Sequence, residues 1–83
     1  MDKAMLWGLG FDGKESDKYI TKGDNFYLIG GSQKTHENMV DDVLRFNRYL
    51  QKYGKKMEDL SREEYYRILR EMGMNDRQWK YFH

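Results

Sequence analysis

The hydrophobic and polar positions of this chain separate an N-terminal part with the pattern of β-structure from a helical remainder. Apolar runs at residues 4–11 and 26–30 flank a short β-branched segment at 18–22, and stretches rich in glycine, aspartate and asparagine divide the three. Short runs between turn-forming residues are typical of antiparallel hairpins. We therefore predict an antiparallel β-hairpin or a three-stranded meander within residues 1–31, in which 18–29 forms either one bent strand or two.

A long amphipathic helix is predicted next. In residues 36–53, apolar side chains recur at spacings of four, three, four and three. The residues of this stripe are Met39, Val43, Phe46, Leu50 and Tyr53. The spacing follows the turn of an α-helix, so the stripe should form one face and pack on the sheet. Acidic residues lie early in the segment and basic residues late, as the helix dipole favours, and Gly54 is a natural C-terminal stop.

A second helix has a clear start signal. Ser61 and Glu64 have the spacing of a capping box, in which each side chain bonds the backbone N–H of the other residue. Apolar residues recur at helical spacing after this point, and Gly73 follows the last of them. We predict a helix over residues 62–72 that ends at this glycine.

The C-terminal segment repeats the start signal. Asn75 and Gln78 stand at the spacing of Ser61 and Glu64, which predicts a third, short helix. Its inward-facing residues would be Trp79 and Phe82.

These elements predict an α+β fold, in which the hairpin or meander is packed by one long helix and two shorter C-terminal helices. A single domain should span residues 1–83, with a β region in 1–31 and a helical region in 32–83. So short a chain has room for one core and for no large internal cavity. Aromatic residues make up 16% of the sequence, and they supply the apolar area that the length does not.

Composition excludes several kinds of chemistry. The chain has no cysteine, so it forms no disulfide and has no thiolate nucleophile or cysteine-based metal site. The net charge of +1 gives no overall field that would gather nucleic acid. No apolar run approaches the roughly 20 residues that a membrane helix needs. We therefore expect a cytoplasmic protein with no membrane association.

The segment LIGGSQKTHENM, residues 28–39, holds the first candidate site. A glycine turn that opens a helix presents free backbone N–H groups, and these groups together with a lysine favour an anion. The candidate anion or ligand site comprises Gly30, Gly31, Ser32, Lys34, Thr35 and His36. The segment does not fit the phosphate loop of nucleotide-binding proteins, because Leu28 and Gln33 stand where that loop has glycine. The alternative, which we favour, is an ordinary strand-to-helix turn capped by Ser32 or Thr35.

His36 is the most reactive residue type in this segment. On the helical wheel it lies within the apolar arc, so we expect a packed, hydrogen-bonded histidine more than a catalyst. His83, the other histidine of the chain, is terminal, and the pair has no recognisable zinc spacing. We predict no metal, no cofactor and no catalytic residue.

A second candidate site is the segment 45–56, which contains five basic residues and no acidic residue. The candidate nucleic-acid stripe comprises Arg45, Arg48, Lys52, Lys55 and Lys56. Such a stripe on a helix could contact phosphates. The alternative is a solvated helix face whose positive charges complement the C-terminal end of the helix dipole.

Residues 9–39 also resemble a small group of prokaryotic proteins that share a GGSxxTHExM-like segment, with His36, Glu37 and Met39 at matching positions. The group has no known activity, so the resemblance adds weight to residues 30–39 without implying a reaction.

The prediction of function therefore depends mainly on the residue types expected at the surface. A surplus of tyrosine and methionine suits an adaptable binding surface, so we predict a non-enzymatic protein-interaction module that binds another protein or itself. The alternative is a nucleic-acid-binding protein that uses the basic stripe. An enzyme ranks third.

Overall fold

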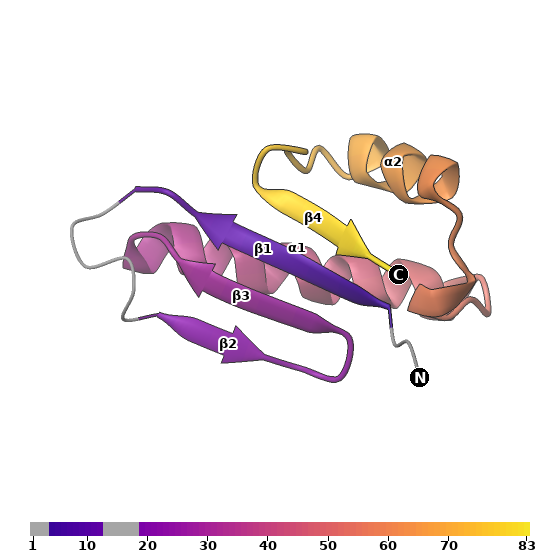
Figure 1. Cartoon of the computed structure of the whole chain (residues 1–83), viewed down its shortest axis with the longest axis horizontal. Coiled ribbons are helices and arrows are strands. Elements are labelled where there is room, and N and C mark those ends of the chain that lie inside the picture. Colours follow the sequence, from indigo (N-terminus) through magenta and orange to yellow (C-terminus); the bar gives the residue numbers. More distant parts are fainter. Residues whose placement is uncertain (1–3, 13–18) are drawn as a thin grey trace.

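The computed structural model describes residues 4–12 and 19–83. In chain order the elements are β1 (Met5–Gly10), β2 (Ile20–Lys22), β3 (Phe26–Gly30), α1 (Gln33–Lys52), the 3₁₀ turn η2 (Met57–Asp59), α2 (Arg62–Glu71) and β4 (Trp79–Phe82). Figure 1 shows two layers, with α1 running behind the sheet and α2 beyond β4. The described part of the chain contains no helix with the length and apolar character needed to cross a membrane.

The four strands form one mixed sheet in the order β2-β3-β1-β4. The two central strands, β1 and β3, are parallel, with Leu6 opposite Phe26 and Trp7 opposite Tyr27. The outer strands run antiparallel to their neighbours, β4 beside β1 and β2 beside β3. The most apolar runs therefore lie in the middle of the sheet, where both of their edges are hydrogen-bonded.

The structure confirms the predicted antiparallel hairpin, and the predicted three-stranded meander is wrong. β2 and β3 form the antiparallel hairpin around residues 23–25, so the described part of 18–29 holds two strands. β1 does not pair with the strand that follows it, because β3 takes the central position beside it in parallel. The short β2 has exposed ends, which an edge strand tolerates better than a central one.

The predicted third helix is wrong, because residues 79–82 form β4. Trp79 and Tyr81 are buried while Lys80 and Phe82 are exposed, which is the period of a strand. Asn75 caps a turn instead of a helix, since its side-chain oxygen accepts a 2.8 Å hydrogen bond from the Arg77 N–H. The chain thus has one shorter C-terminal helix, α2, and the free edge of β1 provides the partner that turns the last segment into a strand.

The long helix is confirmed, and it begins at Gln33 with Ser32 as its N-cap, the earlier of the two predicted starts. Its buried residues are His36, Met39, Val43, Phe46 and Leu50. Tyr53, the last member of the predicted stripe, lies outside the helix at its C-cap and is 57% exposed.

The second helix is also confirmed, and α2 ends at residue 71. The Ser61 hydroxyl accepts from the Glu64 N–H at 3.1 Å, and the Glu64 carboxylate accepts from the Ser61 N–H at 3.0 Å, which completes the capping box. Gly73 follows with a φ of 68°, in the left-handed region that glycine adopts without strain.

The core lies between the sheet and the two helices. Leu6 and Leu28 are fully buried under α1, and Tyr65 of α2 stacks on Tyr81 of β4 at 4.9 Å. A side chain at Gly8 would come within 2.8 Å of both the Leu28 and the Trp79 side chains, so this glycine makes the space that the indole fills. Both helices therefore cover the same face of the sheet.

Candidate functional site

The glycine turn of the first candidate site is confirmed. Gly30 and Gly31 have φ values of 82° and 84°, which other residues rarely adopt. The turn also runs close to β1, since a Cβ on Gly10 would lie 2.4 Å from the Gly31 Cα. These glycines let the chain turn from β3 into α1 within two residues.

Asp12 occupies the position where the helix start would attract an anion. Its carboxylate accepts hydrogen bonds from the Ser32 N–H at 3.0 Å, the Ser32 hydroxyl at 3.0 Å and the Thr35 hydroxyl at 2.8 Å. The Ser32 hydroxyl accepts in turn from the Thr35 N–H at 3.2 Å, as the predicted N-cap. The Ser32 N–H and then the Thr35 hydroxyl lower the pKa of Asp12, because these bonds stabilise the charged carboxylate. The chain thus supplies its own anion to this helix terminus.

Asp12 was missed by sequence reasoning, and no local signal marks it. It lies 20 residues before Ser32, and only the parallel pairing of β1 with β3 brings the two together.

His36 is buried, as the amphipathic pattern predicts, with 7% of its surface exposed. The ring Nδ1 lies 3.0 Å from the Gly30 carbonyl oxygen, and Nε2 lies 2.7 Å from the Thr21 hydroxyl. Nδ1 must carry a proton, because a carbonyl only accepts. The imidazole therefore joins α1 to β2 and to the end of β3, and both of its nitrogens are engaged within the fold.

The other members of the first candidate site are less enclosed. Lys34 is exposed and Thr35 is partly buried. A surface hollow of about 320 Å³ reaches Thr35 and Asp12, with Phe11, Asn75, Arg77 and Gln78 among its other lining residues. The segment thus borders a shallow depression, while His36 faces the interior.

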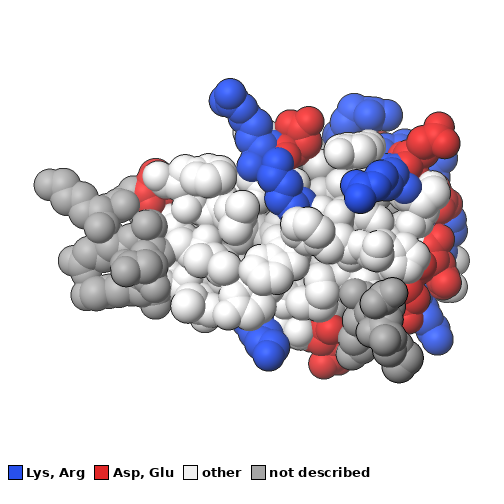
Figure 2. Space-filling view, in the orientation of Figure 1, with Lys and Arg blue, Asp and Glu red and all other residues white. Residues whose placement is uncertain are grey.

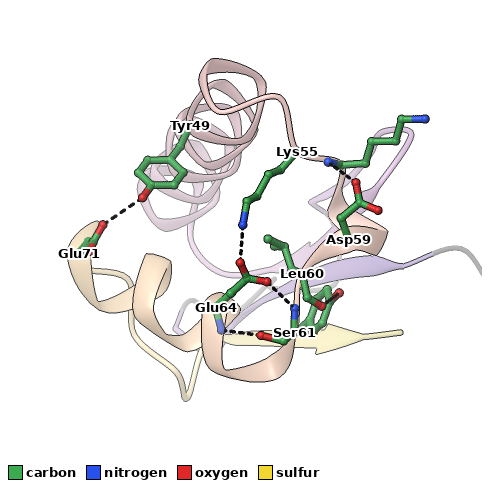
Figure 3. Close-up of polar contacts among 9 residues, drawn as sticks. Tyr49, Lys55, Asp59, Leu60, Ser61, Glu64 and Glu71 are labelled. Carbon is green, nitrogen blue, oxygen red and sulfur yellow. Dashed lines mark hydrogen bonds and ion pairs between the residues drawn. The ribbon is translucent and has the colours of Figure 1, made fainter.

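The basic stripe is partly engaged with acidic groups. Arg45 pairs with the Asp42 carboxylate at 2.9 Å and also donates to the Met72 carbonyl at 3.3 Å. Lys55 forms an ion pair with Glu64 that links the end of α1 to the start of α2 (Figure 3). Lys52 lies over the Tyr53 ring, 5.7 Å from its centroid.

The Lys55–Glu64 pair has an electrostatic consequence. The lysine and the Ser61 N–H both donate to the Glu64 carboxylate, and they lower its pKa from 4.5 to about 2. This pair holds the helices at their junction, so one base of the stripe has a clear structural role.

Within residues 4–12 and 19–83, no three histidine or acidic side chains gather in a way that could hold a metal ion. A hollow of about 470 Å³ lies where α1 ends near the β2–β3 turn, and its polar lining includes Asn25, Asn47 and Lys55. The two asparagines bond one another through both amides, at 2.8 and 3.1 Å, so they serve as a link between turn and helix.

The main surface feature that sequence reasoning missed is the uncovered side of the sheet. Side chains alternate along a strand, so the neighbours of the buried strand residues point away from the helices. We call this surface the open face; its residues are Met5, Trp7, Leu9, Ile20, Lys22, Tyr27, Ile29, Lys80 and Phe82. The orientation of Figure 2 looks onto it and shows a mostly uncharged centre with charged side chains at the border.

The apolar side chains of the open face form continuous cross-strand rows. Leu9 and Ile20 both pair with Ile29, one on each side of β3. The Trp7 and Tyr27 rings stack at 4.7 Å with an interplanar angle of 25°, and Phe82 meets Trp7 edge-on at 6.2 Å. Ile20 and Phe82 remain 57% and 56% exposed.

The strand β1 shows the contrast between the two faces within one segment. Its helix-facing positions include Leu6, Gly8 and Gly10, while the open face receives Met5, Trp7 and Leu9. Two positions toward the core thus carry no side chain, and the largest residue of the strand points outward.

The chain matches no protein-family model, and comparison with curated proteins and with solved structures also finds no match. A function is therefore proposed from the arrangement of the chain's own side chains.

Proposed function

We propose that this protein is a non-enzymatic interaction module that binds a partner protein through the open face. The observation that carries the proposal is the apolar character of a sheet surface that no helix of residues 4–12 and 19–83 covers. A sheet with one solvated face normally alternates apolar residues inward with polar residues outward. Here Trp7, Tyr27, Ile29 and Phe82 stand on the outward side.

The composition of the open face also supports this function. Aromatic residues and methionine are enriched in the centres of protein interfaces, and contiguous apolar patches on small proteins mark interaction sites. The Trp7–Tyr27 stack is held by neighbouring central strands, so it offers a rigid anchor whose geometry exists before binding. Rigid aromatic anchors reduce the entropy lost on association.

Photo-cross-linking in the source cells tests the proposal and identifies the partner. A photoreactive residue at position 20 or 82 should capture a protein that the same residue at exposed position 44 or 66, on the helical side, does not. The captured protein is then purified, and its affinity is measured with matched variants.

We expect Ile20→Ser with Phe82→Ser to weaken that affinity by about tenfold or more, since central apolar anchors each contribute over about 1 kcal/mol. The control pair Leu44→Ser with Tyr66→Ser should leave the affinity nearly unchanged, because both residues lie on the helical side. Equal affinity for both double variants would contradict the proposal. Loss of binding only on charge reversal of Arg48 and Lys52 would move the function to the basic stripe.

A further inference from the structure

Two lysines lie at opposite ends of one row of the open face. The pairing of the strands sets the order Lys22, Tyr27, Trp7, Lys80 across the sheet. Three strand spacings of about 4.8 Å place the two lysine backbones roughly 14 Å apart. Within residues 4–12 and 19–83, no acidic residue stands at an outward-facing strand position. The outward-facing strand positions are therefore apolar in the centre and positive at the two edge strands.

These lysines differ from two bases of the helical side. Arg45 and Lys55 each pair with a carboxylate of the chain. Lys80 has a 3.5 Å hydrogen bond to the Asp76 carbonyl oxygen, and among the described residues neither Lys22 nor Lys80 has a carboxylate partner. A lysine can lay its stem along apolar surface while its ammonium group reaches outward. Both charges are thus placed for a ligand that carries negative groups beside an apolar strip.

A second copy of this chain does not fit such a surface. When two copies of the sheet pack face to face with aligned strands, the edge strands of one copy lie over the edge strands of the other. Either β2 lies over β4 of the second copy, or each edge strand lies over the same strand of the second copy. Lys22 lies on β2 and Lys80 on β4, so either arrangement brings like charges together. Four strands about 4.8 Å apart and about 15 Å long also give a footprint of only about 300 Å². Each partner of a stable globular pair contributes about 800 Å² of accessible surface, so a globular partner would have to extend well beyond these strands, whereas a short peptide segment would not.

Single-stranded nucleic acid fits poorly for a different reason. Base stacking needs open ring faces. Trp7 turns one ring face toward Tyr27, and Phe82 meets the indole edge-on. Rings stacked across neighbouring strands stand upright and present their edges to the ligand. Ring edges carry the positive end of the aromatic quadrupole, so they favour oxygen atoms such as those of a carboxylate.

We infer that the ligand of the open face is an acidic amphipathic protein segment, whose apolar side chains pack on Trp7, Tyr27 and Ile29 while carboxylates on its two sides pair with Lys22 and Lys80. This inference rests on the proposed function and adds the chemistry of the partner. Two such pairs at the border of an interface give specificity and association rate more than affinity.

Fluorescence anisotropy with synthetic peptides tests the inference. The probe is a labelled helical peptide with a leucine and phenylalanine stripe flanked on both sides by glutamate, and its matched control has glutamine at those positions. We expect the glutamate peptide to bind about three- to tenfold more tightly, with a preference that shrinks as salt rises. Lys22→Gln with Lys80→Gln should abolish the preference, and Arg48→Gln with Lys52→Gln should retain it.

The outcomes separate the inference from the function on which it rests. If Ile20→Ser with Phe82→Ser abolishes binding of both peptides and wild type shows no preference between them, the open face remains a protein site and the acidic partner is wrong. If that double variant binds both peptides like wild type, the open face is not the site and both proposals fail. Tighter binding of labelled oligouridine than of the glutamate peptide, or dimerisation in ultracentrifugation that Ile20→Ser removes, would also overturn the inference.

Discussion

Trp7 and Tyr27 stand opposite each other on the two parallel central strands, and their rings stack with centroids 4.7 Å apart on the side of the sheet that faces away from α1 and α2. Trp79 lies on the other side of the same sheet and is 1% exposed. The two tryptophans of the chain therefore have opposite environments, which gives a direct test of what each face contributes.

Trp79→Ala should lower the free energy of unfolding by about 3–5 kcal/mol, as for other large side chains removed from a core. Trp7→Ala should cost less, about 1–2 kcal/mol, because its ring is partly exposed and loses mainly the stack with Tyr27. Urea denaturation of both variants gives the comparison. A larger cost at Trp7 than at Trp79 would mean that the sheet face assigned as open is covered.

The buried stripe of α1 predicts a difference in stability between two leucine variants of this helix. Leu50 is 3% exposed and Leu44, on the same helix, is 43% exposed. Leu50→Ala should therefore lower stability by about 2–5 kcal/mol. Leu44→Ala should stay within about 0.5 kcal/mol of wild type, since this side chain lies at the surface, outside the core. Denaturation midpoints that are equal for the two variants would show that the stripe is not core.

The ion pair between Lys55 and Glu64 predicts a pH dependence of stability. The pKa of Glu64 is lowered in the folded state from 4.5 to about 2, so the folded protein binds this proton less readily than the unfolded chain. The stabilisation is therefore present above about pH 4.5 and lost as the pH falls toward 2. Glu64→Gln should flatten the stability curve across that window, whereas Glu63→Gln, in the same helical turn, should keep the wild-type slope. An NMR titration of the Glu64 carboxyl with a midpoint near 4.5 would contradict this assignment.

Replacing Asp12 should destabilise the start of α1, and an added anion should restore its stability. Asp12→Ala removes three hydrogen bonds from the start of α1, so the amide protons there should exchange faster, while Asp41→Ala on the exposed helix surface should leave them unchanged. The vacated helix start should then accept an external anion. Phosphate should raise the melting temperature of Asp12→Ala more than that of wild type. An equal effect of phosphate on both proteins would argue that this carboxylate does not fill an anion position.

Much of the helical structure could be predicted because its signals are local. Ser61 and Glu64 satisfy each other's backbone groups within one turn, and the α1 stripe needs only its own spacing. The turn at Gly30 and Gly31 and the burial of His36 follow from the same local patterns. The partners of His36 do not, since Thr21 approaches it only through the pairing of β2 with β3.

The C-terminal segment shows where local signals fail. Asn75 and Gln78 have helix-start spacing, yet residues 79–82 are hydrogen-bonded as a strand beside β1. A strand obtains its backbone partners from another part of the chain, so tertiary pairing decides between the two structures. The same holds for Asp12, whose hydrogen-bond partners lie 20 and 23 residues away.

By itself the sequence determined α1 and α2, the cap of α2 and the apolar character of β1 and β3. Only the tertiary structure decided which side of each strand is buried, because β1 carries apolar residues or glycine at every position and alternation alone does not distinguish its faces. α1 and α2 both pack against the side of Leu6 and Gly8, where the missing side chains of glycine make room for the Trp79 indole. Trp7 and Tyr27 therefore lie on the opposite side, and the open face exists because both helices of the described residues pack on one side of the sheet.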